Sequence, residues 1–194
     1  MTDLHAYLTE AAAEAARIAR GVPVGPEQLA APTPCAAWDT RALLNHWILY
    51  TSYGLEHRAL REPLPEELTA RDFTAGPDWA RAYAEQLDRA VAAWADPAVW
   101  EGEIDLGPAR MPAAEIASMI IKELAVHGWD VARATGQEYR CGDGLGELVL
   151  GVVDRHGEVY RRYDGFAAPV TLPAPAAASA FDRALALSGR TPWA

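Results

Sequence analysis

The chain has 194 residues, of which 51% are hydrophobic and 23% are charged, a mixture typical of one globular domain. This composition excludes intrinsic disorder, collagen and coiled coils. The 17 basic and 27 acidic side chains give a formal net charge of −10, so neither nucleic acid nor an anionic membrane surface is expected as a partner.

Proline and glycine divide the first part of the chain into three predicted helices. Apolar residues at helical spacing predict the first helix over residues 2–20. A second helix is expected over residues 39–61, where an aspartate suits the N-cap, and a third over residues 77–95. The segment 100–110 contains two glycines and a proline, which predict a short extended crossover or a hairpin.

The rest of the chain predicts three further helices, over residues 112–135, 144–163 and 179–187. The sequence shows no internal repeat and no low-complexity segment that would divide it. We therefore expect an all-α fold in a single domain over residues 1–194. Its architecture would be a four-helix bundle with additional short helices and a short extended crossover.

Cysteine usage and hydropathy predict a cytoplasmic protein. Cys35 and Cys141 are too few for a disulfide framework, and the N-terminus lacks the basic end and apolar run of a signal peptide. The longest largely apolar stretch, residues 116–129, is interrupted by Lys122, Glu123 and His127 and falls short of the roughly 20 residues that span a bilayer. No membrane-spanning helix is expected.

Polar residues on one face of the predicted helix 112–135 are the first candidates for chemistry. Glu123 and His127 are four residues apart, so their side chains lie one above the other, and Asp130 continues that face. Two histidines with this spacing bind zinc in helical metalloproteases. Here the first ligand would be a carboxylate and the catalytic glutamate of that motif is absent, so a protease is not expected.

A metal site in a helical bundle draws its remaining ligands from a facing helix. His46 lies midway along the predicted helix 39–61, and with Glu123 and His127 it would form a set of two histidines and one carboxylate. Such a set suits catalytic Zn²⁺, and it equally suits Fe²⁺ and other first-row ions. His57 lies about 16 Å from His46 along the helix axis and cannot join the same site.

Each candidate also has a purely structural interpretation. A single histidine is more often a hydrogen-bonded, half-buried side chain than a metal ligand. Glu123 beside Lys122 could be a solvated corner of the helix, and Asp130 with Arg133 could be an ordinary surface ion pair. Spacing along the chain leaves these alternatives open.

Four segments of the chain carry a family resemblance. Residues 33–38 read Thr-Pro-Cys-Ala-Ala-Trp and are followed by Leu-Leu-Asn-His at 43–46. Residues 123–137 begin Glu-Leu-Ala-Val-His-Gly-Trp-Asp, and residues 189–193 read Gly-Arg-Thr-Pro-Trp. In this order the motifs resemble the DinB-like metal-binding proteins of actinobacteria, which are related to the N-terminal domain of mycothiol-dependent maleylpyruvate isomerase. The resemblance spans nearly the whole chain.

The resemblance implies a bundle of up-down-down-up topology that binds a divalent metal ion through His46, Glu123 and His127. Zn²⁺ is the leading ion, with Fe, Ni and Mn as alternatives. Asp130 would hold the other ring nitrogen of a ligand histidine. Cys35 is open to two interpretations, a nucleophile or a small buried residue in a turn. In relatives the metal activates a low-molecular-weight thiol such as mycothiol, which is added to or exchanged on an electrophilic substrate.

Three classes of function follow from these expectations. The leading class is a thiol-dependent transferase or isomerase that acts on a small electrophile. A metal-dependent hydrolase would instead activate water. A non-catalytic metal-binding or regulatory domain would close the metal with a fourth protein ligand. The oligomeric state is open, with a homodimer among the options.

Overall fold

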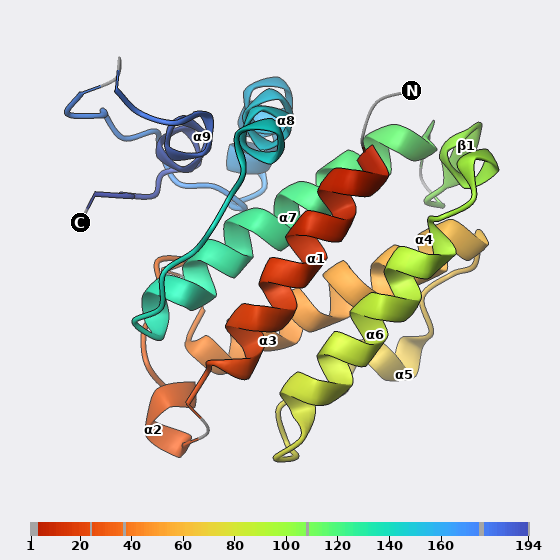
Figure 1. Ribbon diagram of the computed structural model, residues 1–194, viewed down its shortest axis with the longest axis horizontal. Coiled ribbons are helices and arrows are strands. Elements are labelled where there is room, and N and C mark those ends of the chain that lie inside the picture. The colour runs from red at the N-terminus through yellow and green to blue at the C-terminus, as the bar shows by residue number, and fades with distance from the viewer. Residues whose placement is uncertain (1–3, 24, 37, 108, 175–176, 194) are drawn as a thin grey trace. The chain divides into compact units, whose positions relative to one another are not determined.

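The computed structural model describes residues 4–23, 25–36, 38–107, 109–174 and 177–193 of the chain (Figure 1). Most of these residues are helical, and the one sheet found among them is a two-stranded hairpin, which confirms the all-α class. The chain divides into two compact units, residues 1–139 and 140–194. The single domain over residues 1–194 stays a prediction, as does the four-helix bundle with its up-down-down-up topology.

Helices α1, α3, α6 and α7 build the first unit, and each lies where the sequence predicts a helix. Their bounds are α1 Leu4–Arg20, α3 Thr40–Ile48, α6 Trp79–Ala93 and α7 Ala113–Ala134. Helix α1 packs against α6 and α7, and α3 packs against α7 (Figure 1). Polar residues of α3 and α7 can therefore face one another. Among the described residues, no helix is both long and apolar enough to cross a membrane.

The predicted helix 39–61 is interrupted by a change of helix type. After α3 the chain makes a π-helical turn, η1 (Leu49–Tyr53), and continues as α4 (Gly54–Leu60). Thr51 lies within this turn, and its buried hydroxyl donates a hydrogen bond to the carbonyl oxygen of Trp47 at 2.5 Å. π-Helical turns inside α-helices are rare and are frequent at functional sites.

Short elements connect the longer helices, and the sequence did not place them individually. They are α2 Pro26–Leu29, α5 Glu66–Thr69, the 3₁₀ turn η2 Pro97–Trp100, β1 Glu103–Asp105 and β2 Arg110–Pro112. The strands pair antiparallel with Ile104 opposite Met111, so the predicted crossover 100–110 includes a hairpin. Gly107 adopts a φ of 88° in its turn, a conformation that favours glycine.

Buried tryptophans tie the helices of the first unit together. Trp47 and Trp94 are fully buried, and each indole N–H donates to a backbone carbonyl of another helix. Trp47 Nε1 bonds the oxygen of Leu124 at 3.3 Å, and Trp94 Nε1 bonds the oxygen of Leu55 at 2.9 Å. A buried indole needs such a partner, so these bonds fix the register between helices as well as filling the core.

The second unit contains α8 (Asp143–Arg162) and α9 (Ala180–Leu187), which match the helices predicted over 144–163 and 179–187. The two helices pack closely against each other. Gly146 permits this approach, because a Cβ there would lie 3.2 Å from the backbone nitrogen of Phe181. Ser179 caps α9 in a capping box with Asp182.

Candidate metal centre

Three predicted side chains from α3 and α7 converge in the first unit. Glu123 and His127 lie one turn apart on α7, with Oε2 of Glu123 3.0 Å from Nε2 of His127. His46 reaches the same oxygen from α3, at 3.4 Å from its Nε2. One ligand atom of each residue lies within 4.8 Å of the others, a grouping that could hold a metal ion. The structure therefore brings together the ligand set that the sequence predicts.

The approach of α3 to α7 behind this cluster depends on a small residue. Gly128 follows His127, and a Cβ at this position would lie 2.9 Å from Cε2 of Tyr139 and 3.3 Å from Cζ2 of Trp47. Both neighbours are aromatic rings and have little room to move. Together with the bond from Trp47 to Leu124, the glycine sets the spacing at which His46 meets α7.

Asp130 orients the imidazole of His127. Its carboxylate is completely buried, and Oδ2 lies 2.9 Å from Nδ1 of His127. A carboxylate only accepts hydrogen bonds, so Nδ1 carries the proton and Nε2 is turned toward Glu123 and His46. Asp130 is therefore a buried residue and not a surface carboxylate.

Lys122 is also part of the cluster. Its side chain is 2% exposed, and its ammonium forms an ion pair with Oε1 of Glu123. Lys122 is therefore not part of a solvated corner, whereas the side chain of Glu123 remains 24% exposed. The sequence interpretation missed this contact. An i, i+1 pair on a helix usually points two ways, and only the packing turns this lysine inward.

The charges around the cluster shift two pKa values. Burial works to raise the pKa of Glu123, but Lys122, His127 and His46 outweigh it and hold that pKa well below its usual range. Burial works to lower the pKa of His127, but the carboxylates of Glu123 and Asp130 outweigh it and raise that pKa above its ordinary value. Without a metal the cluster therefore favours an ionised glutamate beside a protonated histidine, and a cation competes with that proton.

Aromatic rings surround His46. The ring of Trp38 lies 4.4 Å from that of His46 and 5.6 Å from that of His127, measured between centroids. Tyr50, in the π-helical turn, lies 4.8 Å from His46 and is 45% exposed. Tyr50 lies four residues after His46 in the sequence, and helical periodicity does not predict the π-helical turn that contains it.

A threonine positions Trp38 in the Thr-Pro-Cys segment. The hydroxyl of Thr33 donates to the carbonyl oxygen of Trp38 at 2.9 Å and accepts from the backbone nitrogen of Cys35 at 3.1 Å. This small network closes the loop that brings the indole to the cluster. Cys35 is half-buried, and nothing in the structure decides between its two interpretations.

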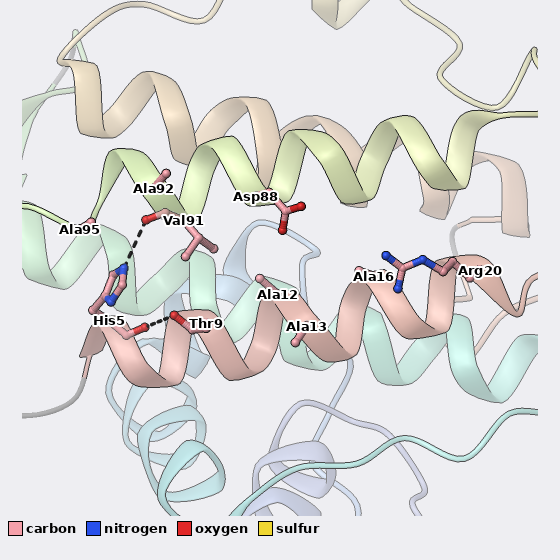
Figure 2. A pocket seen from close by; sticks show the side chains of 10 residues that line it. All are labelled: His5, Thr9, Ala12, Ala13, Ala16, Arg20, Asp88, Val91, Ala92 and Ala95. Carbon is pink, nitrogen blue, oxygen red and sulfur yellow. Dashed lines mark hydrogen bonds between the residues drawn. The ribbon is translucent and has the colours of Figure 1, made fainter.

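His57 and a groove between α1 and α6 lie apart from the cluster. Nδ1 of His57 lies 3.8 Å from Oε2 of Glu62, and the residue does not belong to the candidate metal group. The groove has a volume of about 420 Å³, and alanines make up half of its lining residues. Figure 2 shows His5 and Arg20 toward its two ends. His5 bonds the carbonyl oxygen of Val91 at 3.2 Å, which stabilises the packing of α1 on α6.

Comparison with known proteins identifies one relationship. The model of the mycothiol maleylpyruvate isomerase N-terminal domain family matches residues 8–132, which include all three residues of the cluster. The matched segment ends within the first compact unit. No curated protein and no solved structure matches the chain.

Proposed function

Because the chain belongs to the DinB-like family of the mycothiol maleylpyruvate isomerase N-terminal domain, we propose that it binds a divalent metal ion through His46, Glu123 and His127. With that ion it would act as an enzyme that uses a low-molecular-weight thiol, such as mycothiol, on a small electrophile. The reaction would be an S-transfer or an isomerisation. Zn²⁺ is the first candidate ion, and Fe, Ni and Mn are the alternatives.

The convergence of three acceptor atoms carries this proposal. Two imidazole nitrogens and one carboxylate oxygen come within 4.8 Å of one another from two helices. Two histidines and a carboxylate are the donor set of many catalytic metal sites. Among the described residues the group has three members, which would leave coordination positions for a thiol or a substrate. The residues present therefore fit a divalent ion.

The residues around the cluster have distinct proposed roles. A bound divalent ion would supply a lower thiol pKa, so that the thiolate is available at neutral pH. Asp130 holds the imidazole of His127 in the orientation that turns Nε2 toward the cluster. Trp38 packs its ring against both histidines and shields them on one side. We assign no role to Cys35.

The bundle topology, the cellular location and the partners of the protein are also proposals. We propose that the first unit is a four-helix bundle with up-down-down-up topology and that the protein is cytoplasmic. Residues 1–139 carry 21 acidic and 11 basic side chains, whereas residues 140–194 carry six of each. This excess of negative charge supports small molecules as partners over nucleic acid or anionic membranes.

Metal analysis of purified protein tests the site. We expect about one divalent ion per chain in the wild type, because the three ligands form one site, and almost none in His46→Ala and Glu123→Ala. His57→Ala is the matched control, because His57 lies on α4 outside the cluster, and it should keep the metal. Full metal content in both cluster variants would overturn the proposed site.

Thiol dependence tests the reaction class. The metal-loaded wild type should accelerate the conjugation of mycothiol with chlorodinitrobenzene, a generic electrophile, and His46→Ala should not. Turnover of an ester in thiol-free buffer would favour a metal-dependent hydrolase instead. In a non-catalytic domain a fourth protein ligand would close the metal site. Added thiol would then leave the visible absorption of the Co²⁺-loaded protein unchanged.

A further inference from the structure

The only lysine of the chain lies in the candidate metal centre. The other sixteen cationic residues are arginines, and most lysines of folded proteins are exposed. Lys122 is instead 1% exposed, among the most buried large side chains of the chain. A buried ammonium is costly unless it is paired, and its ion-pair partner is the carboxylate of Glu123.

The contacts of Glu123 divide its two oxygens between different partners. Oε1 faces the ammonium of Lys122, whereas Oε2 faces the imidazoles of His127 at 3.0 Å and His46 at 3.4 Å. An arginine would present a planar fork that engages both oxygens of a carboxylate. The compact ammonium takes one oxygen and leaves Oε2 as the single ligand atom that Glu123 offers to a metal.

The charge of Lys122 also changes the electrostatic balance of the centre. Its ammonium places a positive charge against Oε1 of Glu123, whose other oxygen is a proposed metal ligand. Charges in such buried surroundings interact more strongly than in water. We propose that Lys122 makes the metal centre selective for an anionic external ligand over a neutral one. This inference rests on the proposed metal binding and narrows the ligand class of the same site.

Ligand binding to the Co²⁺-loaded full chain tests this proposal without an activity assay. Azide serves as the anionic probe and imidazole as the neutral probe, and both are followed by the visible absorption of Co²⁺. Lys122→Met removes the charge and keeps the length of the side chain. We expect the variant to bind azide about tenfold more weakly than the wild type and to bind imidazole within about twofold of it.

Two further variants make the result decisive. Arg110→Met removes a positive charge from the exposed strand β2, and it should leave both affinities unchanged. Lys122→Gln removes the same charge with a polar end group and replaces Lys122→Met if that variant does not fold. Equal azide affinity in the wild type and in Lys122→Met, or in Lys122→Gln where that variant replaces it, overturns the proposed role of Lys122 but not the metal site. A wild-type chain that takes up no Co²⁺ overturns the metal site as well.

Discussion

Helix α3 contributes to two polar clusters, and their difference separates a structural cluster from a candidate binding site. One is the metal-site cluster of His46, Glu123 and His127. The other, which we call the Asp72 cluster, joins Asp72 to Arg41, Asn45 and Thr74. Arg41 and Asp72 are each 42% exposed in their side chains, whereas the side chain of His127 is 9% exposed.

Donors and acceptors are matched in the Asp72 cluster and unmatched in the metal-site cluster. Asp72 accepts from the hydroxyl and backbone nitrogen of Thr74, from Asn45 and from Arg41, at 2.7 to 3.1 Å. In the metal-site cluster three acceptor atoms point at one another, and a proton or a cation must lie between them. A cluster complete in itself stabilises the fold, whereas an excess of converging acceptors indicates a ligand.

The largest expected effect is the loss of metal-dependent stability on removing one acceptor. At a free Zn²⁺ concentration 1,000 times the Kd, the wild type should gain about 4 kcal/mol in free energy of unfolding. His127→Ala should gain almost nothing. Urea denaturation with and without Zn²⁺ measures both. Asp72→Asn is the matched control and should keep the full gain; an equal gain in His127→Ala would contradict the assignment.

The second-largest effect is on metal affinity, when the hydrogen bond from His127 to Asp130 is weakened. Asp130→Asn keeps the size of the buried side chain but weakens the hydrogen bond that orients His127, so metal affinity should fall about 10- to 100-fold. Competition with a chromogenic chelator gives the Kd. The same substitution at Asp72 should leave the Kd unchanged, and a comparable loss there would remove the distinction between the two clusters.

A smaller effect is expected where α3 approaches α7. Gly128→Ala should lower the free energy of unfolding by about 1–3 kcal/mol, because the new Cβ meets the rings of Tyr139 and Trp47. Gly151→Ala on α8 is the control, since nothing lies within 4 Å of a Cβ there and alanine favours helix. Urea denaturation should show opposite signs for the two variants. Equal signs would mean that the spacing at Gly128 is not tight.

The smallest effect is the pH dependence of the stability that the Asp72 cluster contributes. The hydroxyl of Thr74, with help from Asn45 and Arg41 and against the effect of burial, lowers the pKa of Asp72 from 3.8 to about 2. Its ionised form therefore stabilises the fold above about pH 4, and this contribution disappears as the pH falls toward 2. After solvent screening we expect less than about 1 kcal/mol. The stability difference between the wild type and Asp72→Asn should shrink between pH 6 and pH 2; a difference that stays constant would contradict this prediction.

Much of the helical fold follows from the sequence because periodicity and helix-stopping residues act locally. The helix predicted over 112–135 differs from α7 by one residue at each end. The π-helical turn at Leu49–Tyr53 could not be foreseen, because helical periodicity does not distinguish it from an α-helix. Its buried Thr51 also meets the hydroxyl of Tyr83 on α6 at 2.8 Å, a contact that exists only once the helices have packed. Short helices such as α2 were missed for a related reason: four residues carry too little periodicity.

The candidate site also has a part that local sequence predicts and a part that depends on how the helices pack. The spacing of Glu123 and His127 placed them on one face of a helix, since that relation lies within a single element. The addition of His46 rested on the general rule that a metal site in a helical bundle draws ligands from a facing helix, and the family resemblance implied the same three residues. The burial of Lys122 could not be predicted from its charge, which on its own favours a solvated side chain. Burial is a property of the assembled helices.

The buried position of Lys122 has a practical consequence for chemical labelling. Reagents that acylate lysine side chains have no exposed target anywhere in this chain, because its one lysine is 1% exposed. Acylation of Lys122 then requires the packing around α7 to open. The rate of that reaction would report local opening at this one position beside the metal-site cluster, without an introduced probe.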